Sequence, residues 1–230
     1  QISLDLKEAR KREEVLTRVP PFWCFNKTVD LYPQCCFNHR IGMPSEAIVI
    51  KSKKVPEIYD YQIDLFKAVE EKKRLLMVKS RKIGATEIMK RAIAYYAMYG
   101  FTKGYQTVII PGTRADLSSR HIQEIRLLYE RGGYEEMIDK DKSLQQYIKL
   151  TNGSEIMGFP SNPTASRGLQ NVMLIFIDEA ASFDMRDDQQ AEVLNACEGN
   201  LAVTNGNLTM ISTPKGRRGI FYESYMDQSE

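Results

Sequence analysis

A short apolar run, a basic loop and a helix follow one another directly between residues 75 and 99, and this succession constrains the fold more than any other feature. Leu75–Val78 is typical of a buried strand, and residues 86–99 have the pattern of a helix. The loop of residues 79–86 between them has the length of the phosphate loop G-x-x-x-x-G-K-[ST]. In that arrangement the free N–H groups at the helix N-terminus face a bound phosphate.

The loop departs from that pattern in the position of its cation. In the register of the motif, Lys79 stands at the first glycine, Gly84 at the second, Ala85 at the lysine and Thr86 at the hydroxyl. Every functional group of the motif is still present, with the cation moved from the end of the loop to its start. The loop therefore fails the strict motif but keeps its chemistry.

Strands and helices alternate along the rest of the chain, which is the signature of a mainly parallel sheet flanked by helices. The uninterrupted apolar run at 172–177 is expected to be a central strand of that sheet. The sequence Thr151-Asn152-Gly153-Ser154 predicts a hairpin. The further elements expected are hairpin strands at 147–150 and 155–159, strands at 106–110 and 207–212, and helices at 59–71, 115–131, 188–199 and 220–226.

The first part of the chain does not follow this alternation. A charged helix is expected at 4–18, and aromatic, Cys-rich sequence without periodicity follows it. We interpret residues 1–47 as an N-terminal cap and residues 48–230 as the core. The cap contains four residues that could hold zinc or pack as buried apolar groups: Cys24, Cys35, Cys36 and His39. Their spacing lacks a paired CxxC knuckle, which favours buried thiols.

Composition excludes several classes of protein. Hydrophobic residues make up 43% and charged residues 27% of the 230-residue chain, as in ordinary globular proteins. No apolar run approaches the roughly 20 residues of a membrane span, and no signal-peptide pattern is present. Residues 1–90 contain 18 Lys or Arg against 12 Asp or Glu, whereas residues 91–230 contain 14 against 18. The basic first part permits contact with a polyanion without requiring it. The cysteines favour a reducing cytoplasm.

Two further motifs follow apolar strands. Asp178 and Glu179 come directly after the apolar run, where a nucleotide hydrolase places a metal carboxylate and the carboxylate that polarises the attacking water. Ser212-Thr213-Pro214 follows the strand at 207–212. Because carboxyl ends of parallel strands meet at one sheet edge, its hydroxyls are expected beside the two acids, where they can sense the γ-phosphate. An ordinary Ser/Thr/Pro turn is the alternative.

These three motifs together resemble the ATPase domain of a large terminase, the DNA-packaging motor of tailed viruses. The resemblance runs from about residue 55 to 222, and some terminases have a deviant phosphate loop of the form K-S-R-x-I-G-A-T. It implies a P-loop NTPase fold of the ASCE type that binds ATP and Mg²⁺. It also implies that Ser212-Thr213-Pro214 is the motif that couples hydrolysis to movement.

The resemblance assigns roles to the matching residues. Glu179 would be the catalytic base, and Thr86 and Asp178 would contact Mg²⁺. Lys79 would replace the usual loop lysine; we favour it for the β- and γ-phosphates, with Arg81 as the catalytic sensor of the γ-phosphate. The remaining ATP-binding residues of the loop would be Ser80, Lys82, Ile83, Gly84 and Ala85, with Lys82 a solvated neighbour.

Two residues outside the motifs have open interpretations. Gln62, in Tyr61-Gln62, lies where terminases often have a glutamine that reads adenine, but it could equally be a polar residue on a helix. Arg167, in Thr164-Ala165-Ser166-Arg167-Gly168, resembles an arginine supplied in trans to a neighbouring subunit, where it would neutralise transition-state charge. A plain surface loop is the alternative.

By resemblance the chain is expected to act in the host cytoplasm, at the procapsid portal. Its expected partners are double-stranded DNA, the portal protein, the small terminase subunit and further copies of itself in a ring, without a membrane. No acidic-cluster nuclease follows the coupling motif, so we expect a piece of a longer protein. The alternatives are a helicase-like nucleic-acid translocase and, because of Ala85, a module that binds nucleotide or nucleic acid without hydrolysis.

Overall fold

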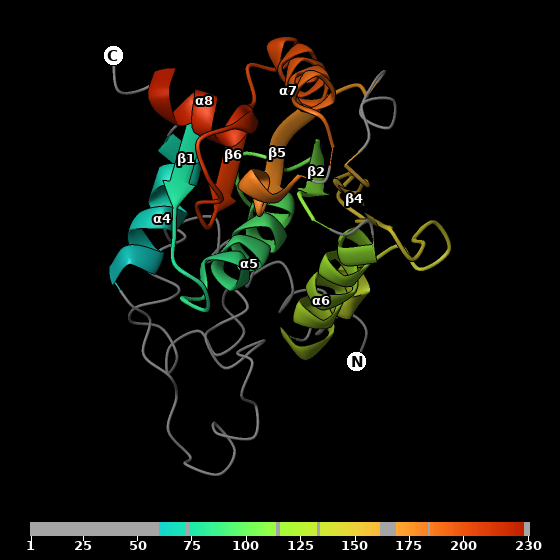
Figure 1. Ribbon diagram of the computed structural model, residues 1–230. Helices are drawn as coiled ribbons and strands as arrows, with labels where there is room; N and C mark the ends of the chain where they lie inside the picture. The colour runs from blue at the N-terminus through green and yellow to red at the C-terminus, as the bar shows by residue number, and fades with distance from the viewer. Residues whose placement is uncertain are drawn as a thin grey trace, which may run out of the picture.

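The computed structural model describes residues 60–71, 74–113, 116–132, 134–161, 169–183 and 185–227 (Figure 1). The strands are β1 (Arg74–Val78), β2 (Gln106–Pro111), β3 (Tyr147–Lys149), β4 (Glu155–Gly158), β5 (Val172–Asp178) and β6 (Asn207–Ser212). The helices are α4 (Asp60–Glu71), α5 (Ala85–Met98), α6 (Asp116–Gly132), α7 (Asp187–Ala202) and α8 (Gly219–Asp227). Each of these elements was predicted from the sequence, with ends that differ by a few residues. The short helices η2 (Glu135–Met137) and η3 (Ala180–Ser182) were not. The predicted cap, with its cysteines, lies outside the described residues.

The strands form one sheet in the order β1-β6-β5-β2-β4-β3. All neighbours are parallel except β3 and β4, which form the predicted antiparallel hairpin. Because β4 also pairs in parallel with β2, the hairpin extends the main sheet. The prediction of a central strand at 172–177 is confirmed, since β5 lies between β6 and β2. One strand, β6, separates β1 from β5, so the phosphate-loop strand and the acidic strand are not direct neighbours.

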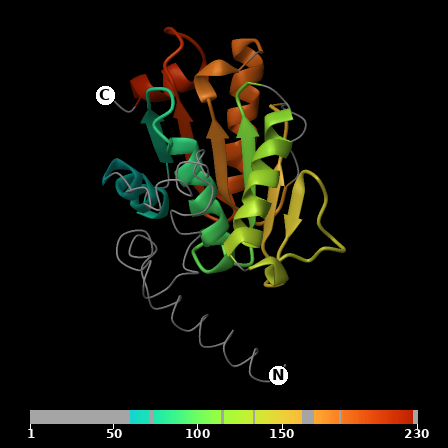
Figure 2. The ribbon, with the colours of Figure 1, turned by 90° about the horizontal axis from the view of Figure 1, so that it is seen from below.

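Helices cover both faces of the sheet, and Figure 2 shows α5 and α6 on one side and α7 on the other. The alternation of side chains along β5 explains the two layers. Leu174 and Phe176 pack into the core beneath α4, α5 and α6, whereas Ile175 and Ile177 pack into the core beneath α7 and α8. A strand buried on both faces needs apolar residues at every position, which accounts for the uninterrupted run.

The parallel strands bring their carboxyl ends to one edge of the sheet, where the loops after β1, β2, β5 and β6 meet. Lys79 is held there by its backbone N–H, which donates to the Ser212 carbonyl at 2.9 Å. Gly112, after β2, donates in the same way to the Asp178 carbonyl at 2.6 Å. This edge gathers the motifs that the sequence singled out. Within the described residues, no helix is long and apolar enough to cross a membrane.

Candidate active site

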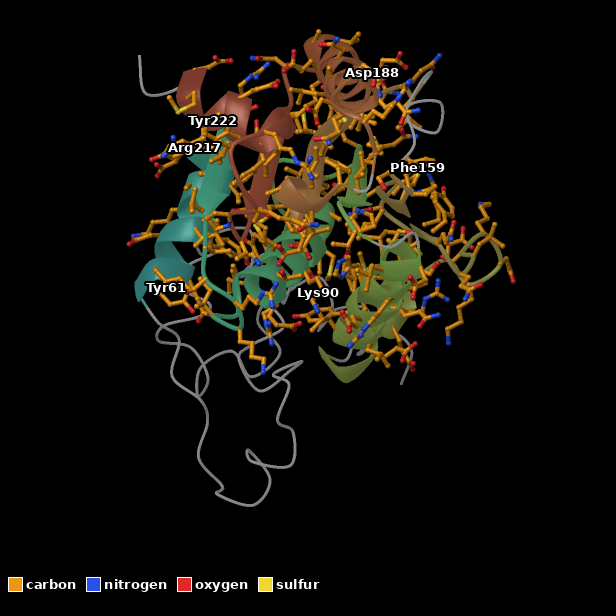
Figure 3. All side chains as sticks on the ribbon, in the orientation of Figure 1. Tyr61, Lys90, Phe159, Asp188, Arg217 and Tyr222 are labelled. Atoms are coloured by element: carbon orange, nitrogen blue, oxygen red, sulfur yellow. The ribbon has the colours of Figure 1, made fainter. Side chains whose placement is uncertain are left out.

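The loop after β1 turns sharply before α5 begins. Gly84 has φ of 83° and Lys82 has φ of 62°, both in the left-handed region. The N-terminal end of α4 supports this turn: the Tyr61 hydroxyl donates to the Ile83 carbonyl, and Figure 3 shows Tyr61 at that end of the helix. The positive φ of Gly84 favours glycine, and a Cβ on residue 84 would also lie 2.8 Å from Nε2 of the buried Gln62. Gln62 therefore packs against the loop instead of facing solvent.

Lys79 lies at the start of the loop, and its side chain is almost completely buried. Its Nζ donates to Glu179 Oε1 at 2.5 Å, with side-chain exposures of 6% for Lys79 and 30% for Glu179. A lysine at the first loop position thus reaches the end of β5, two strands away in the sheet. The misplaced cation lies among the acidic residues of the site instead of pointing into solvent.

Thr86, in the first turn of α5, faces the other acidic residue. Its hydroxyl donates to Asp178 Oδ1 at 3.1 Å. A hydroxyl and a carboxylate are hard oxygen ligands of the kind Mg²⁺ takes, usually with one or two carboxylates and substrate phosphates completing the shell. The described residues contain no cluster of three or more acidic, His or Cys side chains that could hold a metal without such help. The donor set fits a magnesium ion that arrives with a nucleotide.

The segment after β6 holds the carboxylate of Glu179 from the side opposite Lys79. The Ser212 hydroxyl lies 3.4 Å from Glu179 Oε2, and the Thr213 backbone N–H donates to the same oxygen at 3.3 Å. Ser212 Oγ also accepts from the Ala181 N–H at 3.0 Å. The Ser212 hydroxyl thus lies beside Glu179 as predicted, whereas Thr213 contacts Glu179 through its backbone N–H and its own hydroxyl has no hydrogen-bond partner among the described residues. Pro214 is exposed just beyond them.

Backbone strain concentrates at this site. Four non-glycine residues among those described have positive φ, and two of them are asparagines, which tolerate it. The other two are Lys82 and Glu179, and Glu179 has φ of 52°. Such strain persists only where the surroundings fix the backbone, and it clusters at functional sites. Here the left-handed turn directs the Glu179 carboxylate back toward β1 and β6.

A buried histidine for which the sequence carried no signal contacts Asp178. His121 Nε2, on α6, lies 3.3 Å from Asp178 Oδ2, and both side chains are 8% exposed. Glu124 lies behind it, 3.7 Å from His121 Nδ1, and accepts from Lys90 Nζ at 2.6 Å. Burial lowers the pKa of His121, but its contacts with Asp178 and Glu124 outweigh burial and raise that pKa.

Glu124 anchors this network. Burial raises the pKa of Glu124, but its contacts with His121, Lys90 and Arg120 outweigh burial and hold the pKa well below its usual range. The chain of contacts therefore runs from Asp178 through His121 and Glu124 to Lys90 on α5. His121 lies beside Oδ2 of Asp178, whereas Thr86 contacts Oδ1.

Other predicted site residues lie apart from these contacts. Arg81 and Lys82 are exposed on the loop, as is Ser80, and Arg81 reaches no acidic partner among the described residues. The exposed position of Lys82 agrees with its prediction as a solvated neighbour. Arg167 lies outside the described residues, so its role stays a prediction.

No family profile matches the sequence. The ATPase domain of the large terminase of Thermus phage P74-26 has a similar fold, with a TM-score of 0.51 and 21% identity over 78% of this chain and 73% of that one. The large terminase of a thermophilic bacteriophage, in complex with ADP, gives a TM-score of 0.56 and 19% identity over 74% of this chain and 42% of that one.

A third similar structure is Dbp5 of S. cerevisiae, with a TM-score of 0.51 and 10% identity over 81% of this chain and 49% of that one. At these identities the likeness concerns the fold. The described residues have the fold of P-loop ATPase domains, and phage terminases are among the proteins that share it. The chain spans less than half the length of the ADP-bound terminase.

Proposed function

We propose that this chain is the ATP-hydrolysing motor domain of a viral genome-packaging terminase, which couples hydrolysis to translocation of double-stranded DNA into a procapsid. One observation carries the hydrolytic part of the proposal. The loop after β1 and the acids after β5 contact each other twice, through Lys79 with Glu179 at 2.5 Å and through Thr86 with Asp178 at 3.1 Å. A phosphate-binding loop and two carboxylates are the parts that phosphoryl transfer to water requires.

The site residues divide the chemistry between them. Phosphates would lie against the backbone N–H groups of residues 80–86, at the positive end of α5. The Glu179 carboxylate would accept a proton from the attacking water, and the Ser212 hydroxyl and Thr213 N–H would keep its second oxygen oriented. In this structure the Lys79 ammonium is paired with the Glu179 carboxylate. When a nucleotide binds, the ammonium would leave Glu179 and contact phosphate oxygens instead.

Mg²⁺, where bound with the nucleotide, neutralises charge that develops on the phosphate oxygens. Thr86 and Asp178 would hold it, and His121 would keep Asp178 oriented through the contact at 3.3 Å. Exposed Arg81 is free of acidic partners among the described residues and would approach the γ-phosphate from the loop. Arg167 would act on a neighbouring subunit, which requires a ring of several copies.

Several parts of the proposal come from the terminase likeness. The terminase of the thermophilic bacteriophage binds ADP, and we infer that this chain binds adenine nucleotides at its own loop, with Gln62 near the adenine. The portal protein and the small terminase subunit would be its partners in the host cytoplasm, at the procapsid portal. Ser212-Thr213-Pro214 would couple hydrolysis to movement, since it contacts Glu179 directly.

Two other functions can be compared with this one. A helicase-like translocase also fits the shared ATPase fold, since Dbp5 has a similar fold. A non-hydrolysing module is favoured by Ala85 at the usual lysine position. The buried Lys79 weighs against it, because a cation already reaches the acids from the other end of the loop.

Phosphate release from Mg²⁺-ATP, with and without double-stranded DNA, tests the proposal. We expect turnover in the wild type and a fall of at least about 100-fold in Glu179→Gln, which keeps the shape of the side chain but cannot act as a base. Binding of a fluorescent ATP analogue should persist in that variant. Wild-type turnover in Glu179→Gln would rule out the assigned base. Binding without any turnover in the wild type, even with DNA, would favour the non-hydrolysing module.

A further inference from the structure

A basic groove lies next to the candidate active site, on the α7 and α8 side of the sheet. Its volume is about 540 Å³, and its walls are the segment after Glu179 and the loop between β6 and α8. Lys215 and Arg218 line it from the loop, and Arg186 lines it from the start of α7. Ala181, Phe183 and Met185 provide an apolar surface between these cations.

The positive charge of the groove is only partly neutralised. Lys215, Arg217 and Arg218 are exposed and form no ion pair with any described residue. Arg217 extends the basic surface past the groove; Figure 3 shows it beside α8. Acidic groups are also present: Asp187 lines the groove, and Asp188 pairs with Arg186 at 3.0 Å. The unpaired charge therefore belongs to the loop after β6.

One buried side chain joins the two walls. Gln190, on α7 and 7% exposed, donates from Nε2 to the Met185 carbonyl at 3.0 Å, and its Oε1 accepts from the Ile220 N–H at 3.3 Å. Gly219 has φ of 79° and lies against the same amide, so the end of the loop is fixed. Gln190 thus joins the segment at Met185 to the start of α8, beside the loop that contains Lys215 and Arg218.

We propose that this groove binds the sugar–phosphate backbone of double-stranded DNA, with Lys215 and Arg218 on the phosphates. A nucleic-acid backbone offers both groups that the groove accepts: phosphates for the cations, and apolar sugar faces for Phe183 and Met185. Contacts limited to the backbone carry no sequence information, as a packaging motor requires. The choice of DNA as the polyanion rests on the proposed function. The charge and shape of the groove are observed independently of that function.

The groove is also connected to the hydrolytic site. The Ser212 hydroxyl accepts from Ala181 on one wall, and Thr213, at the base of the other wall, donates to Glu179. A backbone bound between Lys215 and the segment after Glu179 therefore bears on both supports of the Glu179 carboxylate. DNA in the groove is expected to change the rate of hydrolysis, and the nucleotide state to change the grip on DNA.

Fluorescence anisotropy with a labelled duplex of about 30 base pairs tests the proposal. In Lys215→Gln/Arg218→Gln we expect binding at least about 10-fold weaker near 0.1 M salt. The slope of log Kd against log salt should fall by roughly 2, because each lost phosphate contact removes about 0.9. Basal phosphate release should stay within about twofold of wild type, while any stimulation by DNA is lost. Lys215→Arg/Arg218→Lys should bind DNA nearly as the wild type does.

Lys140→Gln/Lys142→Gln is the control for the loss of two positive charges, since both lysines are exposed and precede the edge strand β3, with Lys142 paired to Asp139 at 3.1 Å. Wild-type DNA affinity and salt slope in the Lys215→Gln/Arg218→Gln variant would refute DNA binding in the groove. An equal loss of DNA affinity in the control variant would refute it as well. If the double variant has a lowered melting temperature, Arg217→Glu replaces it in the test, and its affinity for the duplex should also be lower than that of the wild type. Preference of the wild type for poly-glutamate over duplex would assign the groove to an acidic protein instead. Loss of DNA binding in the variant, with no ATP turnover in the wild type, would keep the groove and refute the motor.

Discussion

Replacing Gly112 with alanine displaces the acidic pair without removing any of its chemical groups. The Gly112 N–H donates to Asp178, and a Cβ on residue 112 would lie 2.8 Å from the carbonyl carbon of Glu179 and closer still to its oxygen. Ordinary contacts begin at 3.4 Å. The Glu179 backbone must therefore retreat by about 0.6 Å at the carbon and by about 1.3 Å at the oxygen, since a packed interior offers no slack.

Gly112→Ala should change the rate of ATP hydrolysis more than the affinity for ATP. A displacement of about 1 Å can cost about 100-fold in rate, so we expect kcat for phosphate release to fall roughly 30- to 100-fold in Gly112→Ala. ATP affinity should stay within about threefold, because the loop of residues 79–86 is not touched. Overpacking of this kind also lowers the free energy of unfolding by about 1–3 kcal/mol.

Gly199→Ala is the matched control for Gly112→Ala. Gly199 lies within α7, and no atom lies within 4 Å of the Cβ that alanine would add. Alanine there should raise the free energy of unfolding by about 1 kcal/mol and leave the rate unchanged. Steady-state phosphate release measures kcat, analogue binding measures the ATP affinity, and thermal melting measures the change in stability. A folded Gly112→Ala protein with wild-type kcat would refute the reasoning that the position of Glu179 limits hydrolysis.

Three further predictions concern side chains of the site. Thr86→Val, which loses its hydroxyl beside Asp178, should raise the Mg²⁺ concentration for half-maximal phosphate release about 10-fold, whereas Thr86→Ser should not; equal Mg²⁺ curves would exclude Thr86 from the metal. Lys79→Met should weaken ATP-analogue binding at least about 10-fold. A double-mutant cycle of Lys79→Met with Glu179→Gln should show a coupling in unfolding free energy of about 1 kcal/mol, because the ion pair is partly solvated. Additive effects of the two substitutions would show that the ion pair does not contribute to stability. Glu124→Gln should destabilise the protein at pH 7. Because the folded pKa of Glu124 lies well below its unfolded value, its contribution is present above the usual Glu range and shrinks progressively as the pH falls below that range. The difference between variant and wild type in urea unfolding should therefore be smaller at pH 3 than at pH 7; a constant difference would contradict this.

The elements of the sheet could be predicted because their signals are local. The apolar run at 172–177 has to be a strand buried on both faces, and Thr151-Asn152-Gly153-Ser154 has to turn. The rule that parallel strands end at one edge of the sheet then predicts that Ser212 lies close to Glu179. What this rule does not give is which neighbour each strand takes. The parallel pairing of β4 with β2 had no signal in the sequence.

The site contacts that were missed depend on residues far apart in the chain. His121 is one polar residue on an amphipathic helix, and nothing near it in the sequence indicates that it faces Asp178. Gly112 directly follows β2, and its close approach to Glu179 follows only from the pairing of β2 with β5. The position of the Lys79 ammonium could not be predicted either, because a long side chain can reach several partners from the same backbone.

The most direct measurement of the central claim is a crystal structure of the protein with Mg²⁺ and a non-hydrolysable ATP analogue. We expect the β- and γ-phosphates on the N–H groups of residues 80–86, the metal between Thr86 and Asp178, and the Lys79 ammonium moved from Glu179 to a phosphate oxygen. Glu179 would then face the γ-phosphate with an oxygen free to take a proton from water. Nucleotide bound elsewhere, or phosphates in the loop with Lys79 still paired to Glu179, would contradict the account.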